Sequence, residues 1–220
     1  MFITGDVHAD IKEFQSRSFG RIKKSDAVII CGDFGALWDG GKAELKRLKS
    51  LGKKRYKTLF IDGEHENFDL LLKYPVTEWN GGKVRVLSRN LMQMCRGQVF
   101  TINGKKIFTF GGGESIDREL RTENKSWWPQ EMPTRQEMQE GMDNLERSGW
   151  QVDYIITHDV PSAFKRLMEA EVTRLSPLNV YLDKIREKCV HKKWIFGGYH
   201  RNKRLSQNIE AVYNGVLKCE

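Results

Sequence analysis

Short apolar runs that end in glycine, aspartate or histidine recur along the chain. Continuous apolar runs of this length are typical of strands covered on both faces of a sheet. The runs lie at Phe2–Thr4, Ala27–Cys31, Thr58–Ile61, Tyr154–Ile156 and Trp194–Phe196. Helical patterns separate them, near residues 10–19, 41–51, 66–74, 134–148 and 177–188. This alternation predicts an α/β domain with a layered sheet core.

The middle and the end of the chain favour strands joined by tight turns. Further strands are expected at Val84–Leu87, Val99–Ile102 and Lys106–Phe110, and Asn103-Gly104 is a strong hairpin signal between the last two. The stretch 209–216 around Asn214-Gly215 predicts another strand pair. The sheet is therefore expected to be mixed, or to be two sheets packed face to face. The stretch 111–133 is the least regular, and loops of this length in compact domains are often functional.

The composition is that of an ordinary globular protein. A length of 220 residues suits one domain, and no repeat or linker-like segment divides the chain, so we expect a single domain over residues 1–220. No apolar run approaches the roughly 20 residues of a membrane span, and the start lacks the pattern of a signal peptide. The expectation is a cytoplasmic protein without a membrane partner, in which the four cysteines stay reduced.

The charge of the chain points to anionic partners. A net charge of +8 raises the local concentration of nucleotides, nucleic acids and phosphoproteins. Much of this charge clusters between Lys42 and Lys57. That cluster is either the solvated face of a helix with the turn after it, or a surface that binds a polyanion.

Side chains that bind metals recur directly after the predicted strands. Because the loops beyond the carboxyl ends of strands converge on one crevice in layered α/β sheets, these side chains are expected to lie together. Mixed carboxylates and imidazoles suit Mn²⁺, Fe, Zn²⁺ or Ni²⁺ better than Ca²⁺ or a thiolate zinc site. We therefore expect one or two divalent transition-metal ions, with Mn²⁺ first among them. The candidate residues are Asp6, His8, Asp33, Glu64, His65, His158 and His200, and the remaining histidine, His191, is expected to be exposed.

Taken together, these motifs resemble those of the calcineurin-like metallophosphoesterase superfamily. In order they are Gly5-Asp6-x-His8, Gly32-Asp33-x-Gly35, Gly63-x-His65-Glu66, Thr157-His158 and Gly197-x-x-His200, and they span residues 5–200. The resemblance implies a four-layer αββα sandwich of two mixed β-sheets flanked by helices. It also implies two metal ions about 3.5–4 Å apart.

The resemblance also implies roles for single residues. Asp6, His8, Asp33 and His200 would bind the first metal, Asp33 would bridge to the second, and His158 would bind the second. His65 and Asp33 are the expected catalytic residues, with His65 beside the leaving group. Since metals lower the pKa of bound water to about 7, a metal-held hydroxide would attack phosphorus, and His65 could donate a proton. The implied activity is hydrolysis of phosphomonoesters or phosphodiesters.

Two positions depart from the family pattern, and both fall on the second metal. Glu64 stands where the family usually has asparagine, and Gly198 stands where it usually has histidine. Three interpretations stay open: a second site rebuilt from Asp33, Glu64, His158 and water, a single tightly held metal, or a degenerate site in a protein that only binds nucleotides or nucleic acid. A nuclease is a further alternative that the net charge favours.

Contacts to substrate have to come from other residues. Arg118 and Arg121 could clamp a phosphate, or they could pair with neighbouring acids in a surface loop. Tyr199 lies between metal-site positions and could reach the substrate. Trp127 and Trp128 either stack on a nucleobase or close the core beneath the loop.

Overall fold

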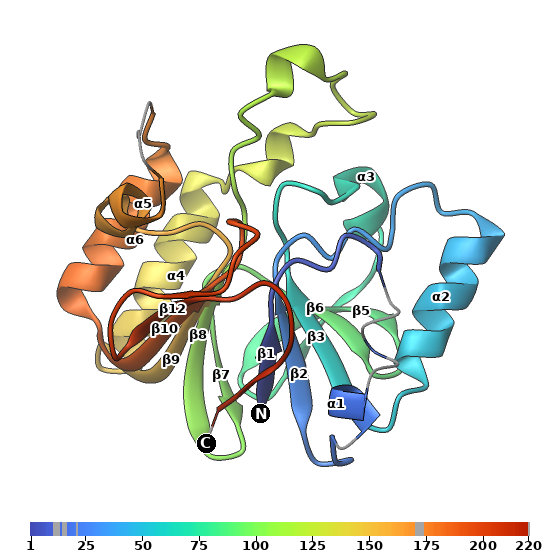
Figure 1. Ribbon diagram of the computed structural model, residues 1–220, viewed down its shortest axis with the longest axis horizontal. Coiled ribbons are helices and arrows are strands. Elements are labelled where there is room, and N and C mark those ends of the chain that lie inside the picture. Colours follow the sequence, from blue (N-terminus) through green and yellow to red (C-terminus); the bar gives the residue numbers. More distant parts are fainter. Residues whose placement is uncertain (11–13, 15–16, 21, 170–173, 220) are drawn as a thin grey trace.

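Two β-sheets pack face to face in the computed structural model, and helices cover the outer face of each (Figure 1). The structure describes residues 1–10, 14, 17–20, 22–169 and 174–219. The layers run helices, sheet, sheet, helices, so the expected αββα sandwich of two mixed sheets is confirmed.

The first sheet holds seven strands among the described residues, in the order β13-β1-β2-β3-β6-β5-β4. Its four inner strands β1, β2, β3 and β6 run parallel, while β4, β5 and β13 are antiparallel to their neighbours. The strands are β1 (Phe2–Thr4), β2 (Ala27–Cys31), β3 (Lys57–Ile61), β4 (Val76–Trp79), β5 (Gly82–Ser88), β6 (Leu91–Met94) and β13 (Leu217–Lys218).

The second sheet holds six strands among the described residues, in the order β11-β12-β10-β9-β8-β7. Strands β8, β9, β10 and β12 run parallel, and the expected hairpin at Asn103-Gly104 joins β7 to β8. The strands are β7 (Gln98–Ile102), β8 (Lys105–Phe110), β9 (Gln151–Thr157), β10 (Val190–Phe196), β11 (Lys203–Arg204) and β12 (Ile209–Ala211).

The helices divide between the two outer faces. The first sheet is covered by α1 (Arg17–Gly20), α2 (Lys42–Gly52) and α3 (Phe68–Leu71), and the second by α4 (Arg135–Arg147), α5 (Ser162–Met168) and α6 (Pro177–Lys188). Helix α4 begins at a capping box in which Thr134 and Glu137 satisfy each other's backbone N–H groups. Short 3₁₀ turns, η2 (Arg118–Leu120) and η3 (Pro129–Glu131), lie in the loop 111–133, which projects at the top of Figure 1.

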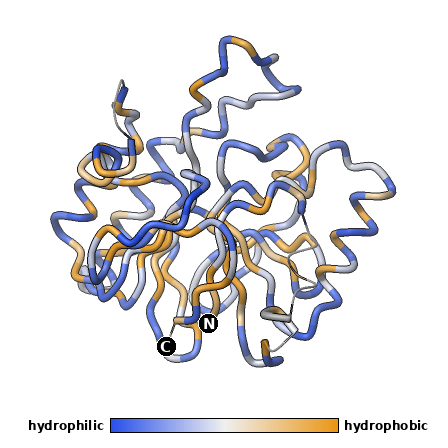
Figure 2. Tube along the Cα trace, in the orientation of Figure 1, coloured by the Kyte–Doolittle hydropathy of each residue, from blue (hydrophilic) through white to orange (hydrophobic). Residues whose placement is uncertain are grey.

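Alternating side chains of single strands supply two different cores. On β2, Ile29 packs into the core between the sheets, while Val28 and Ile30 pack beneath the helices of the first sheet. On β9, Ile156 packs between the sheets and Ile155 beneath the helices of the second. Strand β2 is therefore apolar at every position and β9 is apolar over Tyr154–Ile156, and Figure 2 shows the apolar stretches running along the strands.

Some local predictions were wrong. The stretch 209–216 is not a hairpin, because β12 pairs with β10 while β13 pairs with β1 in the other sheet, so the turn at Asn214-Gly215 carries the chain between sheets. The helix expected over 66–74 is only α3, which begins after the Asn67 cap and is followed by a turn at Leu72 and Lys73 before Pro75. The helix expected over 10–19 lies partly outside the described residues. No helix in the described part of the chain is both long and apolar enough to cross a bilayer.

Candidate metal centre

The carboxyl ends of strands from both sheets meet at one edge of the sandwich, opposite the chain termini (Figure 1). The predicted ligands follow these ends and fall into two groups. The first is Asp6, His8, Asp33 and His200, and the second is Asp33, Glu64 and His158. Within each group the donor atoms all lie within 4.8 Å of one another, and Asp33 belongs to both.

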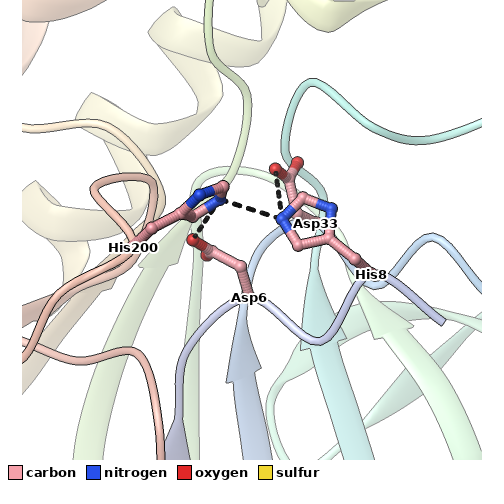
Figure 3. A group of neighbouring side chains, drawn as sticks. All are labelled: Asp6, His8, Asp33 and His200. Atoms are coloured by element: carbon pink, nitrogen blue, oxygen red, sulfur yellow. Dashed lines mark hydrogen bonds and ion pairs between the residues drawn. The ribbon is translucent and has the colours of Figure 1, made fainter. Parts of the chain in front are cut away.

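The first group joins two imidazoles and two carboxylates (Figure 3). Nε2 of His8 lies 2.9 Å from Nε2 of His200 and 3.7 Å from Oδ2 of Asp33. Nε2 of His200 lies 3.4 Å from Oδ2 of Asp6. Four donor atoms of nitrogen and oxygen thus face one small volume, as the ligands of a transition-metal ion do.

Backbone strain marks this group. His8, Asp33 and His200 have φ angles of 40°, 45° and 47°, in the left-handed region that side chains with a Cβ rarely adopt. Each such residue costs about 1–3 kcal/mol, and strain of this kind concentrates at functional sites. The fold thus maintains an unfavourable backbone at three of the four donors.

The second group is built around a buried histidine. Nε2 of His158 lies 3.3 Å from Oε2 of Glu64 and 3.5 Å from Oδ1 of Asp33. On the other side of the ring, Nδ1 lies 2.8 Å from the carbonyl oxygen of Cys31, to which it donates. That hydrogen bond fixes the tautomer and leaves the lone pair of Nε2 for a ligand, which is the usual arrangement of histidines that bind metals.

The electrostatics of the two groups favour a bound cation. Burial raises the pKa of the Asp6 carboxyl to about 7, and the neighbouring Asp33 and Glu64 carboxylates raise it too, against the opposing effect of His158. Burial also disfavours the Asp33 carboxylate, but His158, His65 and His8 hold its pKa below the ordinary value. Three acidic side chains in a mostly buried cluster are short of positive charge, so the residues present fit divalent metal ions.

A comparison with known families agrees with this geometry. The family model described as calcineurin-like phosphoesterase matches residues 1–202 of the chain. The chain belongs to the calcineurin-like phosphoesterase family. A search of curated proteins gave no match. Membership implies metal-dependent hydrolysis of phosphate esters in general.

The two departures from the usual pattern of calcineurin-like phosphoesterases both lie next to His158. Glu64 reaches the second group with its carboxylate, whereas Gly198 brings no side chain there. Gly198 has a φ angle of +76°, and a Cβ on it would lie 3.0 Å from the carbonyl oxygen of His158. Its backbone N–H instead donates to both carboxylate oxygens of Asp6, at 3.0 and 3.1 Å.

His65 lies at the rim of the two donor groups. Its backbone N–H donates to Oδ1 of Asp33 at 2.9 Å, and its ring Nε2 lies 3.9 Å from Oδ2 of the same residue. The ring is 5.0 Å from that of His8, and the side chain is 35% exposed. The imidazole is therefore close to the donor atoms and open to a substrate.

The sequence did not reveal the residues that hold the site together. Glu66 is buried, and its carboxylate accepts N–H groups from Phe34 at 2.7 Å and Gly35 at 3.3 Å, so it ties the loop after β3 to the loop after β2. A Cβ on Gly32 would lie 2.0 Å from Nδ1 of His158. Glu66 and Gly32 both belong to the sequence motifs given above, and that position was the feature of the sequence that could have identified them.

The substrate contacts predicted from sequence are dispersed. Arg121 and Tyr199 line a cavity beside the second group, whereas the exposed Arg118 is not among the lining residues and pairs with Glu114 at 3.4 Å. Trp128 is buried and its Nε1 donates to Asp69, so it belongs to the packing beneath the loop rather than to a stacking platform.

Proposed function

We propose that this protein hydrolyses a phosphomonoester or phosphodiester with His65 beside the leaving group. The observation that supports this most is the pair of donor groups that share Asp33, with His65 at their rim and a cavity of about 390 Å³ next to them. Ions held by these groups would activate water and offset charge on the phosphoryl oxygens. The chain itself has to position the ester and supply a proton to the departing oxygen.

The residues divide this work. Asp6, His8, Asp33 and His200 would hold the first ion, and Asp33, Glu64 and His158 would hold the second, where Gly198 supplies no ligand. Mn²⁺ is the proposed metal, with Fe, Zn²⁺ and Ni²⁺ as alternatives that the same donors accept. His65 is exposed enough to meet the leaving group, and imidazole is suited to proton transfer near neutral pH.

Hydrolysis of two model esters tests this proposal. The purified protein is stripped with a chelator, reloaded with Mn²⁺, and assayed with 4-nitrophenyl phosphate and bis(4-nitrophenyl) phosphate. We expect turnover of at least one ester that disappears on chelation and returns with metal. His65→Asn should lower kcat by about 10²–10⁴-fold, the usual contribution of a general acid. His191→Asn, which changes a histidine outside both donor groups, should leave kcat unchanged.

A catalytically impaired binding protein is the second candidate, and Gly198 is the observation that favours it. In that case nucleotide or nucleic-acid binding would survive both metal removal and His65→Ala, and neither ester would be turned over. The net charge of +8 adds a nuclease as a variant of the first candidate. A nuclease would bind its polymer with an affinity that falls steeply as salt rises.

A further inference from the structure

The cavity of about 390 Å³ runs from the second donor group to helix α5. Its wall includes Glu64 and His158 of that group together with His65. Lys165 and Tyr199 also line it. A cavity of this size accepts a small molecule rather than a long polymer. Because His65 is the residue proposed to face the leaving group, the leaving group of a substrate would lie in this cavity.

Lys165 places a loosely paired ammonium group on the cavity wall. The side chain comes from α5 and is only 16% exposed. Among the described residues its ion pair is with Oε1 of Glu169, and the 3.9 Å separation is too long for a hydrogen bond. A mostly buried ammonium group has three donors to satisfy, so a ligand with an acceptor group in this cavity would find them available.

Two acidic side chains of the cavity wall are paired closely with arginines. Oε1 of Glu114 accepts from Arg174 at 2.9 Å, and Oδ1 of Asp117 pairs with Nε of Arg121 at 2.8 Å. These pairs offset one another and leave no excess charge for a ligand. Lys165 is therefore the group on this wall that is best placed to bind an anion.

Gly198, Tyr199 and Asp159 also line this cavity. Gly198 lines the cavity without a side chain, and next to it the hydroxyl of Tyr199 donates to Oδ1 of Asp159 at 3.3 Å. The other oxygen of Asp159 accepts from Asn179 at 2.8 Å, so this carboxylate is occupied within the protein. Gly198 thus brings no side-chain charge to the wall that Lys165 shares with the second donor group.

We propose that the substrate is a small phosphate ester whose leaving group carries a second anionic group, and that Lys165 binds that group. The proposal rests on the phosphoesterase function proposed above, because the phosphate has to lie at the donor groups. Lys165 is then a specificity-determining residue, since a charge-assisted hydrogen bond from its ammonium group separates substrates with a charged leaving group from those without one.

Binding of non-hydrolysable phosphonates tests this inference without any turnover. Calorimetry on the Mn²⁺-loaded protein compares phenylphosphonate with its 3-carboxy and 4-carboxy derivatives. We expect at least one carboxylated ligand to bind about tenfold more tightly than phenylphosphonate. Lys165→Met should remove that gain, and Lys165→Arg should retain part of it. Arg166→Met is the matched control, because it removes one positive charge from an exposed position of the same helix, and it should keep the full gain.

The outcomes separate this inference from the proposed function. If the carboxylate gain depends on Lys165 but no ester is hydrolysed, Lys165 is the residue of the cavity that binds the second anionic group, while the proposed activity falls. If esters are hydrolysed but neither carboxylate improves binding, the inference is overturned. It is equally overturned if Lys165→Met weakens all three ligands alike, because the lysine would then contact the phosphoryl group instead. Thermal melting of each variant identifies any loss of binding that comes from unfolding.

Discussion

The carbonyl oxygen of Cys31 accepts a hydrogen bond from Nδ1 of His158 at 2.8 Å. Cys31 ends β2 of the first sheet and His158 follows β9 of the second, so this one contact joins the two sheets at the metal centre. It also aims Nε2 of the histidine at Asp33 and Glu64. The same bond therefore links the two sheets and orients a predicted metal ligand.

The space around this bond gives the first prediction. Gly32 has a φ angle of +98°, and a Cβ on it would lie 2.0 Å from Nδ1 of His158. Gly32→Ala should therefore displace the ring and weaken the second metal site. Gly104→Ala is the control, because Gly104 has a φ angle of +73° but open space around its Cβ position. The control should lose about 1 kcal/mol of stability from backbone strain, and Gly32→Ala about 1–3 kcal/mol more from overpacking. Urea unfolding measures the loss of stability, and metal content measures the weakening of the second site. Equal losses in Gly32→Ala and Gly104→Ala would count against a role for the hydrogen bond between Cys31 and His158.

The sharing of Asp33 gives the second prediction, on metal content per chain. Asp6→Asn should weaken the first site alone and Glu64→Gln the second alone, whereas Asp33→Asn should weaken both, because its carboxylate belongs to each group. Asp143→Asn, at an exposed position of α4, is the control and should bind as the unchanged protein does. Elemental analysis after equilibration with limiting Mn²⁺ gives the ratio of metal ions to protein chains. A protein that holds one ion before any substitution, and keeps it in Glu64→Gln, would show that the second group is not a site.

The position of the ligands could be predicted from sequence because the rule behind it is simple. Residues directly after buried parallel strands lie at one edge of a sheet, so Asp6, Asp33 and His158 were expected together without any knowledge of packing. The same reasoning predicted most of the strands and the main helices, but it left open one mixed sheet or two packed sheets, and the resemblance to the family implied two. The prediction of the ligand positions required only an apolar run followed directly by a polar residue.

Other features depend on tertiary contacts that no local pattern contains. Strand β4 is an exposed edge strand, and β6 reads Leu-Met-Gln-Met, which suits a helix as well as a strand, so neither was predicted. Helix α5 is short and lacks a side-chain cap, and the place of Lys165 on the cavity wall follows from how that helix packs. The end of the chain was wrongly predicted as a hairpin because an Asn-Gly turn does not specify which partners the flanking strands choose.

Glu66 gives the third prediction, on the link between two ligand loops. Its carboxylate accepts the N–H groups of Phe34 and Gly35, which follow Asp33 directly. Glu66→Ala leaves the buried N–H of Phe34 and the partly buried N–H of Gly35 unpaired and should cost about 1–3 kcal/mol of stability. Glu66→Gln keeps one oxygen acceptor and should cost less. Because the change also frees the loop that carries Asp33, metal affinity should fall in the same order. Glu119→Ala, at an exposed position, serves as the control in urea unfolding and should be neutral, and a neutral Glu66→Ala would exclude the proposed link.

Glu131 gives the last prediction, on the pH dependence of stability. The side chain is 1% exposed at the base of the projecting loop, and burial raises the pKa of its carboxyl from 4.5 to about 7. The folded protein therefore favours the protonated form. The resulting stabilisation is complete below pH 4.5 and is lost as pH rises through about 7. Relative to Glu131→Gln, which does not titrate, the metal-free protein should thus lose up to about 3 kcal/mol of its free energy of unfolding between pH 5 and 8.5.

Glu140→Gln is the control with the opposite sign, because the hydrogen bond from Lys83 lowers the pKa of Glu140, so that its stabilisation is lost only in acid. Urea unfolding gives the difference in free energy of unfolding between each variant and the unchanged protein. Between pH 5 and 8.5 this difference should be constant for Glu140→Gln and should change for Glu131→Gln. A constant difference for both variants would mean that Glu131 stays ionised in the fold.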